Sequence, residues 1–179
     1  MKINKKELAK IDLSYLADLI TDDEARGFFI LPEGREHYKL LAYLAKQFDN
    51  IIISDIGSYK GCSALALSLN ENNIVESYDI SDMVTISKEP ENIKFFLTDK
   101  IVCGQVLKSE LICLDTIHDG IHERAVIDFL IENKWKGLLI LDDIHHFSDQ
   151  NKLWNDITLK KEDLTSIGHW SGTGLIYFE

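Results

Sequence analysis

Short apolar runs alternate with stretches of helical periodicity along most of the 179-residue chain. The runs are a few residues long and end in polar residues, which is typical of strands that are buried on both faces. We expect such strands over residues 51–55, 74–79, 93–97, 111–115 and 138–142. Apolar residues at helical spacing predict helices over 63–69, about 121–133 and about 152–159. Strands that alternate with helices predict a parallel sheet whose two faces are covered.

The two ends of the chain depart from this alternation. Helical spacing predicts a helix over residues 4–20 and a second over 38–48, with a loop through 31–34 between them. At the other end, strands over 164–170 and 175–178 are separated only by residues 171–174. A parallel crossover needs about a dozen residues, so this pair is expected to be an antiparallel hairpin.

These elements predict an α/β fold. We expect a Rossmann-like three-layer sandwich with a mostly parallel, seven-stranded sheet and a C-terminal antiparallel hairpin. The length suits one domain. Residues 36–179 would form that domain, and residues 1–35 a helical extension or lid, with Phe28, Phe29 and His37 as candidate lid or pocket residues.

Charge and cysteine content narrow the function classes. The formal net charge is −11, which disfavours nucleic acid and anionic membrane surfaces as partners. Cys62, Cys103 and Cys113 form no CxxC pair, so we expect buried free thiols in a reducing compartment. No apolar run approaches the length of a membrane helix, and the first residues lack a signal core. A cytoplasmic protein is therefore predicted.

A glycine-containing turn follows the first strand of the alternating region. Gly57 and Gly61 lie between that strand and the next helix, where the backbone can turn tightly and approach a ligand. Asp55, at the strand end, would repel a pyrophosphate but attract an ammonium or sulfonium group. An ordinary strand–helix turn explains the same glycines. Asp79 ends the next strand and is placed to hold ribose hydroxyls, and Asp99 is a weaker candidate for an adenine edge.

Carboxylates and histidines follow the last two parallel strands. If these strands are neighbours, Asp115, Asp142 and Asp143 converge, and a divalent cation such as Mg²⁺ would relieve their repulsion. Hydrogen bonds to loops and helix caps are the alternative. His145 and His118 lie close by in sequence, and each is a candidate general base or a simple loop histidine.

The ordered motifs resemble class I S-adenosylmethionine (SAM)-dependent methyltransferases. The matching segments are residues 55–63, 78–79, 114–118 and 139–145. The last two resemble the small-molecule and sugar O-methyltransferase branch. That branch often has an Asp-Gly-Asp-His segment after the fourth strand and an Asp-Asp pair after the fifth. Here Ile117 replaces the second acid of the first motif, so that acid cannot be the base.

The resemblance implies SAM as cofactor, Mg²⁺ as a metal and a small-molecule acceptor, with a sugar hydroxyl as one example. Asp55 and Gly57 would line the methionine part of SAM, Gly61 would shape the turn, and Asp79 would bind the ribose. Ser58, Ser63 and Asp115 are further candidates for cofactor contact. Asp115, Asp142 and Asp143 would hold the metal, and His145 would match the base position, with His118 as the substitute.

Two other functions are compatible with the same motifs. A nicotinamide-dependent oxidoreductase or nucleotide-sugar enzyme would also use Asp79, although Asp55 and the closing hairpin argue against it. A cofactor-binding module without catalysis is the second, because the loops are short. The sequence also leaves open a homodimer that completes the pocket.

Overall fold

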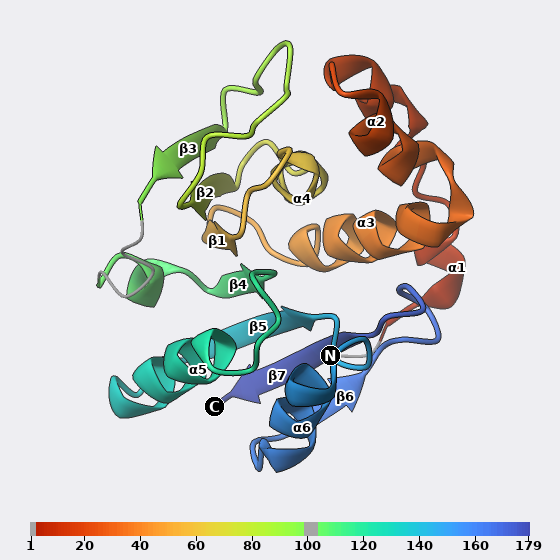
Figure 1. Ribbon diagram of the computed structural model, residues 1–179. Helices are drawn as coiled ribbons and strands as arrows, with labels where there is room; N and C mark the ends of the chain where they lie inside the picture. The colour runs from red at the N-terminus through yellow and green to blue at the C-terminus, as the bar shows by residue number, and fades with distance from the viewer. Residues whose placement is uncertain (1–2, 99–103) are drawn as a thin grey trace.

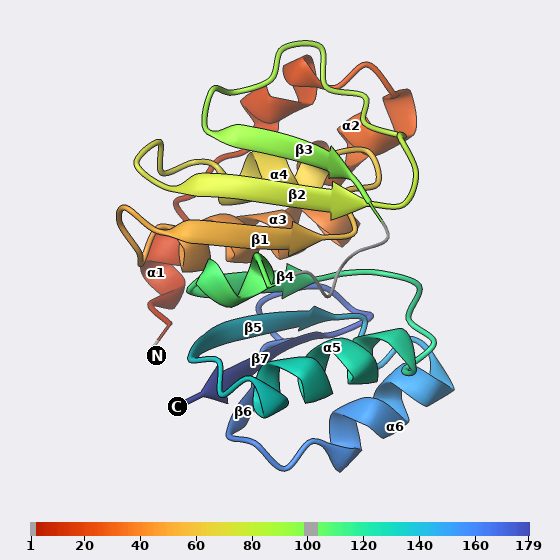
Figure 2. The ribbon, with the colours of Figure 1, turned by 90° about the vertical axis from the view of Figure 1, so that its left-hand side faces the viewer.

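The computed structural model describes residues 3–98 and 104–179. Its centre is a seven-stranded sheet in the order β3-β2-β1-β4-β5-β7-β6, shown in two views in Figures 1 and 2. Its strands are β1 (Ile52–Ile56), β2 (Ile74–Asp79), β3 (Ile93–Leu97), β4 (Leu111–Leu114), β5 (Gly137–Asp142), β6 (Lys161–Asp163) and β7 (Thr173–Phe178). Strands β1 to β5 pair in parallel, and β7 is antiparallel to both β5 and β6. The predicted fold class is therefore confirmed.

Helices cover both faces of this sheet. Figure 1 shows α3 and α4 on one side and α5 and α6 on the other. The helices are α1 (Lys5–Leu8), α2 (Asp23–Ile30), α3 (Pro32–Ala45), α4 (Cys62–Leu67), α5 (His122–Glu132) and α6 (Ser148–Asp156), with 3₁₀ turns η1 (Ser14–Leu19) and η2 (Val106–Lys108).

Alternate side chains of the central strands enter two different cores. In β4, Leu111 and Cys113 pack with α3 and α4, whereas Ile112 and Leu114 pack with α5 and α6. This alternation follows from the two-residue period of a strand. Because both faces of these strands are buried, their sequences are continuous apolar runs.

The N-terminal region differs from the predicted single helix. Residues 4–20 form a four-residue helix capped by the Asn4 side chain, and then η1. Asp12 accepts a hydrogen bond from the Ser14 amide between these two elements, which favours a turn over a continuous helix. The sequence did not predict α2, whose first turn is capped by the Asp22 side chain.

The predicted loop over residues 31–34 is instead the start of α3. Pro32 occupies its first turn, where a missing amide hydrogen costs nothing. The boundary proposed at residue 35 thus falls inside a helix. Residues of α1, η1 and α2 also join the core beneath α3. A lid role for this region stays a prediction.

The C-terminal hairpin is present, but its first strand is earlier than predicted. Strand β6 ends at Asp163, and residues 164–170 form turns instead of the expected strand. Asp163 accepts a hydrogen bond from the Thr165 amide, which closes an Asx-type turn and ends the strand. Similarly, α6 begins at Ser148 and ends at Asp156, earlier than predicted.

Among the described residues, no helix has the length and apolar character needed to cross a bilayer. Cys62 and Cys113 are buried free thiols, as predicted. Cys103 lies outside the described residues.

Candidate functional site

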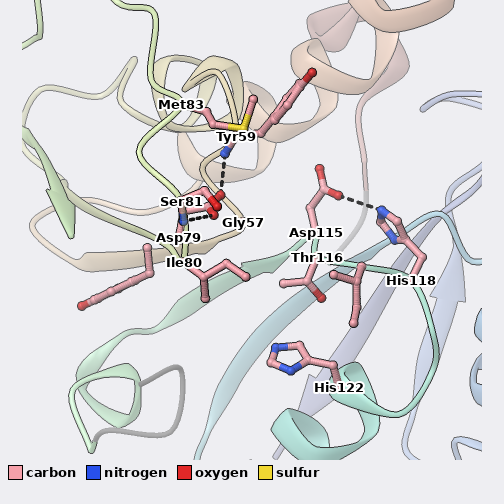
Figure 3. Close-up of a pocket in the computed structure, with 12 residues that line it drawn as sticks. Gly57, Tyr59, Asp79, Ile80, Ser81, Met83, Asp115, Thr116, His118 and His122 are labelled. Atoms are coloured by element: carbon pink, nitrogen blue, oxygen red, sulfur yellow. Dashed lines mark hydrogen bonds and ion pairs between the residues drawn. The ribbon is translucent and has the colours of Figure 1, made fainter. Parts of the chain in front are cut away.

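Two neighbouring cavities lie at the carboxyl ends of the parallel strands. The first has a volume of about 620 Å³ (Figure 3), and its lining includes Gly57, Asp79, Asp115, His118 and His122. The second has a volume of about 540 Å³, and its lining includes Phe28, His37, Tyr38, Asp142, Asp143, His169, Trp170 and Ser171. Tyr59 and Asp115 line both cavities. The two cavities therefore adjoin at these two residues.

Gly57 brings the first turn close to β4. Its φ of +102° lies in the region that favours glycine, and a Cβ at this position would lie 1.6 Å from the backbone oxygen of Asp115. The amides of Gly57 and Ser58 both donate to the carbonyl of Tyr78 in β2. The turn is thus tied to both neighbouring strands, and Gly57 forms part of the cavity wall.

Asp55 lies beneath this turn and lines neither cavity. It is fully buried, and its Oδ2 accepts hydrogen bonds from Ser77 (2.6 Å) and Ser63 (3.0 Å). Its Oδ1 is buried without a hydrogen-bond partner among the described residues. Burial raises the pKa of Asp55 to about 7; the two serines lower it, and the charges of Asp115 and Asp79 raise it further.

The serines of the turn are also internal. Ser58 is buried, and its hydroxyl lies 2.6 Å from that of Ser77. Ser63 is buried in α4. Neither serine lines the first or second cavity, but Ser58 lines a smaller third cavity of about 170 Å³ together with Asp79. The side-chain polar groups of Asp55, Ser58 and Ser63 are hydrogen-bonded to one another or to Ser77 inside the fold, and their cofactor contacts stay predictions.

Asp79 lies at the end of β2, as the sequence predicted, and it lines the first cavity. Its two carboxylate oxygens accept hydrogen bonds from the amides of Tyr59 (2.8 Å) and Ser81 (3.0 Å). These bonds fix the carboxylate at the cavity wall, where its remaining lone pairs can accept hydroxyl protons. Gly61, the residue before α4, has a φ of +90°.

The last predicted cofactor residue, Asp99, lies outside the described residues.

His118 lies between two of the predicted metal ligands. Its Nε2 is 3.3 Å from Asp115 Oδ1 and 3.6 Å from Asp143 Oδ2. Burial lowers the pKa of His118, but the hydrogen bond with Asp115 and the charges of Asp115, Asp143 and Asp142 raise it to about 9. His118 is therefore a cation at neutral pH that neutralises these carboxylates.

Glu123 holds the loop that carries His118. Its carboxylate is fully buried and accepts hydrogen bonds from the Thr116 hydroxyl and from the amides of His118 and Gly120. This arrangement supports the positive φ of 57° at His118. Sequence reasoning missed Glu123. A signal was present, because an acid in the first turn of α5 is placed to cap that helix.

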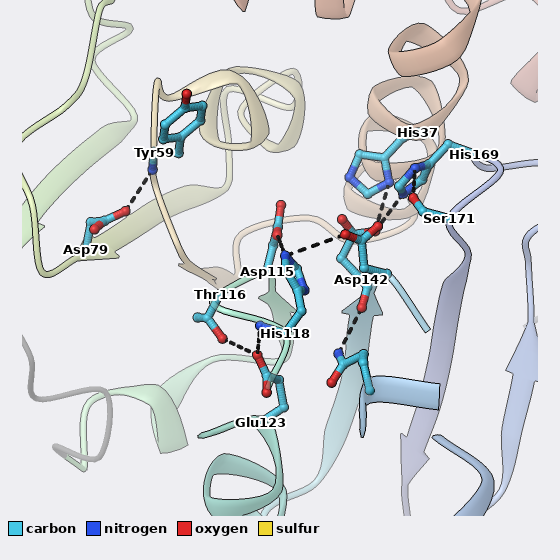
Figure 4. Close-up of polar contacts among 12 residues, drawn as sticks. His37, Tyr59, Asp79, Asp115, Thr116, His118, Glu123, Asp142, His169 and Ser171 are labelled. Atoms are coloured by element: carbon cyan, nitrogen blue, oxygen red, sulfur yellow. Dashed lines mark hydrogen bonds and ion pairs between the residues drawn. The ribbon is translucent and has the colours of Figure 1, made fainter. Parts of the chain in front are cut away.

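A second buried group surrounds Asp142 at the end of β5 (Figure 4). His169 Nε2 lies 2.8 Å from Asp142 Oδ1, and His37 Nδ1 lies 3.5 Å from the same oxygen. Burial lowers the pKa of His37 to about 3. For His169, burial lowers the pKa, but its hydrogen bond and charge interaction with Asp142 raise it above the ordinary value. Sequence analysis missed His169 and named His37 only as a pocket candidate.

The three aspartates do not form the predicted single set of metal ligands. Asp115 and Asp143 face His118, whereas Asp142 faces His169. Across the described residues, the group whose ligand atoms lie within 4.8 Å of one another is His37, Asp142 and His169. His118 and His169, whose pKa values are raised, thus offset part of the carboxylate charge that was expected to be balanced by Mg²⁺. The three carboxylates do not fit that ion in this arrangement, and no reaction step is assigned to it.

The structure places the predicted base His145 outside both cavities. Its Nε2 lies 2.8 Å from Asp163 Oδ2, and its Nδ1 lies 3.1 Å from Asn151 Nδ2. Both ring nitrogens are engaged by α6 and β6, away from Asp115. His118, the second histidine candidate, does line the first cavity.

Comparisons with known proteins place this site in a familiar fold. No protein-family model and no curated protein matches the chain. Among solved structures, SAH-bound methyltransferase PaMTH1 of Podospora anserina has 14% identity and a TM-score of 0.62, and the match covers 100% of this chain and 98% of that one.

Two further structures differ in the atom that is methylated. The O-methyltransferase TomG of Streptomyces achromogenes, in complex with SAM, has 13% identity and a TM-score of 0.56, with 99% of each chain covered. The N-methyltransferase NodS of Bradyrhizobium japonicum has 14% identity and a TM-score of 0.58, with 83% of this chain and 97% of that one covered. The chain therefore has the Rossmann-like fold found in class I SAM-dependent methyltransferases.

Proposed function

We propose that the protein is a SAM-dependent methyltransferase that transfers a methyl group to a hydroxyl of a small molecule. The observation that carries this proposal is the pair of cavities that meet at Tyr59 and Asp115. One cavity has the glycine turn and the acid at the end of β2, and the other provides room for an acceptor. The fold shared with SAM- and SAH-bound methyltransferases supports the choice of cofactor.

The first cavity suits the adenosine part of SAM. Asp79 offers a fixed carboxylate to ribose hydroxyls, which is the role of an acid at this position in Rossmann-like folds. Gly57 leaves space for close approach of the ligand to the backbone. Asp115, which also lines this cavity, would repel a pyrophosphate and attract a sulfonium, whereas Asp79 would suit the ribose of either cofactor. This charge argues against a dinucleotide as the ligand.

The second cavity suits the acceptor. Phe28, Tyr38 and Trp170 provide apolar contact, whereas Asp115 and Asp143 provide hydrogen-bond acceptors. Such a mixture binds a small molecule with both an apolar face and hydroxyl groups. A sugar or another polyol with an apolar face is therefore the acceptor class that we propose.

The chain contributes orientation and a proton acceptor to the reaction. Bound SAM would supply the methyl group on its sulfonium, and the residues of the two cavities would hold the acceptor hydroxyl in line with that methyl group. Asp115 lines both cavities, and burial followed by the charge of Asp142 raises its pKa. We assign to Asp115 the proton released by the acceptor hydroxyl, with His118 holding the carboxylate in place. Positioning of the two reactants provides the remaining rate acceleration.

Thermal unfolding with SAH, SAM and NADH tests the cofactor. A ligand at 100 times its Kd adds about 2.7 kcal/mol to stability, which for this length is a rise in Tm of roughly 5–11 °C. We expect this rise with SAH and SAM but not with NADH. A rise with NADH alone would instead support the oxidoreductase alternative. SAH binding without methylation of any hydroxyl, sugar or amine acceptor would support the non-catalytic module.

Two variants locate the cofactor. Asp79→Asn keeps the shape of the side chain but removes a charged acceptor, so we expect SAH to bind about 10- to 100-fold more weakly. Asp12→Asn is the control, because Asp12 also accepts a backbone amide but lies in neither cavity. Equal affinity of both variants for SAH would contradict the assignment of Asp79.

A further inference from the structure

We infer that His37, Asp142 and His169 form a binding site for a transition-metal dication. The three residues come from α3, the end of β5 and the loop before β7, so the fold brings together side chains that are distant in sequence. Their ligand atoms lie within 4.8 Å of one another. Two imidazoles and one carboxylate are a set that favours ions such as Fe²⁺, Co²⁺ and Zn²⁺ over Mg²⁺, which prefers oxygen ligands.

Asp142, His169 and His37 are held close to one another by polar contacts that a single small cation would replace. His169 Nε2 and His37 Nδ1 lie 2.8 Å and 3.5 Å from Asp142 Oδ1. His37 Nδ1 is also 3.3 Å from the Thr173 hydroxyl. Metal binding would exchange these contacts for coordination bonds, with small movements of the side chains. His37 and Asp142 are almost completely buried, which protects such bonds from water.

A neighbouring hydroxyl orients one of the proposed ligands. Ser171 Oγ lies 2.5 Å from His169 Nδ1, so the opposite ring nitrogen faces Asp142. Metal-binding histidines almost always have such a partner on the second nitrogen, which sets the tautomer and the ring orientation. The backbone carbonyl of Asp142 is held in turn by Gln150. Ser171 is therefore a positioning residue of this site.

Three protein ligands leave a coordination position for another molecule. All three residues line the second cavity, together with Asp115 and Asp143. A metal with three protein ligands and an open position is the usual form of a catalytic site, whereas structural sites are closed by four. Metal binding itself does not depend on the proposed methyltransferase function. The role that we propose for the bound metal, polarising the acceptor oxygen in the second cavity, rests on that function.

Titration with Co²⁺ tests the site directly, because Co²⁺ bound by histidine nitrogen has a visible absorption band. The full chain, without an affinity tag and treated with a chelator, is titrated with Co²⁺ alone and then with Zn²⁺ or Mg²⁺ as competitor. We expect one Co²⁺ per chain, displaced by Zn²⁺ but not by excess Mg²⁺. No Co²⁺ binding, or displacement of Co²⁺ by Mg²⁺, would overturn the inference.

Variants separate this site from other histidines. We expect His169→Gln, which removes a ligand, to weaken Co²⁺ binding by at least about 100-fold. Ser171→Ala removes only the group that positions this ligand and should weaken binding by about 10- to 100-fold. His145→Gln is the matched control, since His145 also lies 2.8 Å from a carboxylate, that of Asp163, but belongs to no three-ligand group among the described residues. It should bind Co²⁺ as the unaltered chain does.

Two measurements keep these results interpretable. Thermal unfolding without metal shows whether each variant folds, and Ser171→Ala, which removes only a hydroxyl, remains informative if His169→Gln does not fold. Equal Co²⁺ affinity of the unaltered chain, Ser171→Ala and His169→Gln would show that Co²⁺ binds elsewhere and would overturn the site. SAH binding is measured on the same samples without metal. Its presence alongside failed Co²⁺ binding would remove the metal site and leave the proposed function intact.

Discussion

Replacement of Asp55 by asparagine is expected to change how the stability of the protein depends on pH. Asp55 is fully buried, and its Oδ2 accepts two serine hydroxyls. Asparagine has nearly the same shape, and its side-chain oxygen can accept the same two hydrogen bonds. The substitution therefore removes mainly the titrating group and its buried charge.

The magnitude follows from the pKa of Asp55. Burial is the largest cause of its rise from 3.8 to about 7 in the folded chain. At pH values between these two pKa values, Asp55 of the folded protein keeps a proton that the unfolded chain has released. The free energy of unfolding therefore falls as the pH rises from about 4 to about 7. At about 1.4 kcal/mol per pKa unit, the full effect is roughly 4 kcal/mol, of which roughly 2–3 kcal/mol falls between pH 5 and pH 8.

Urea unfolding at pH 5 and pH 8, followed by circular dichroism, measures this effect. Titrating groups that do not interact with Asp55 behave alike in both proteins, so their contributions cancel in the comparison. We expect the unaltered chain to lose roughly 2–3 kcal/mol more than Asp55→Asn over this interval. Asp12→Asn is the control, because Asp12 has a lowered pKa and is ionised in both states above pH 5. Parallel pH dependences for the unaltered chain and Asp55→Asn would refute the reasoning.

Three further substitutions test other parts of the site. Gly57→Ala should destabilise the chain by several kcal/mol, because the added Cβ would clash with the Asp115 carbonyl. Gly104→Ala is the control, since a Cβ there meets no atom within 4 Å, and thermal unfolding of the two variants measures the difference. His118→Gln should remove a stabilisation that is present below pH 6.5 and lost as the pH rises to about 9, which unfolding at pH 6 and pH 9 measures. His145→Gln should leave methyl transfer unchanged with an identified acceptor, and a large loss of kcat would restore His145 as the base.

The strand pattern and the turn motifs were readable from the sequence because they depend on local properties. The ranges 74–79 and 93–97 were predicted as strands and are β2 and β3. An apolar run buried on both faces has few other stable arrangements. The short connection before residue 175 likewise required an antiparallel end, because a parallel crossover needs a longer chain.

The position of the cavity residues at strand ends was also predictable. Parallel strands present their carboxyl ends at one edge of the sheet, so Asp79 and Asp115 had to lie near the same edge. The pattern did not reveal α2, because its eight residues contain only one i, i+3, i+4 set, Ala25, Phe28 and Phe29, which is too short a stretch to establish a helical period. It also joined α1 to η1, because helical spacing continues through the turn at Asp12.

Only the tertiary structure decided which acid meets which histidine. His145 is two residues from Asp143 in sequence, yet it pairs with Asp163, whereas the more distant His169 pairs with Asp142. Loop side chains have no periodicity that fixes their direction, and their partners come from segments that meet only after the sheet forms. The sequence by itself therefore determined the sheet and the edge that carries the site. The fold determined which histidine lies beside which aspartate, because a buried carboxylate is stabilised by the cationic group that is nearest in space and not by the one nearest in sequence.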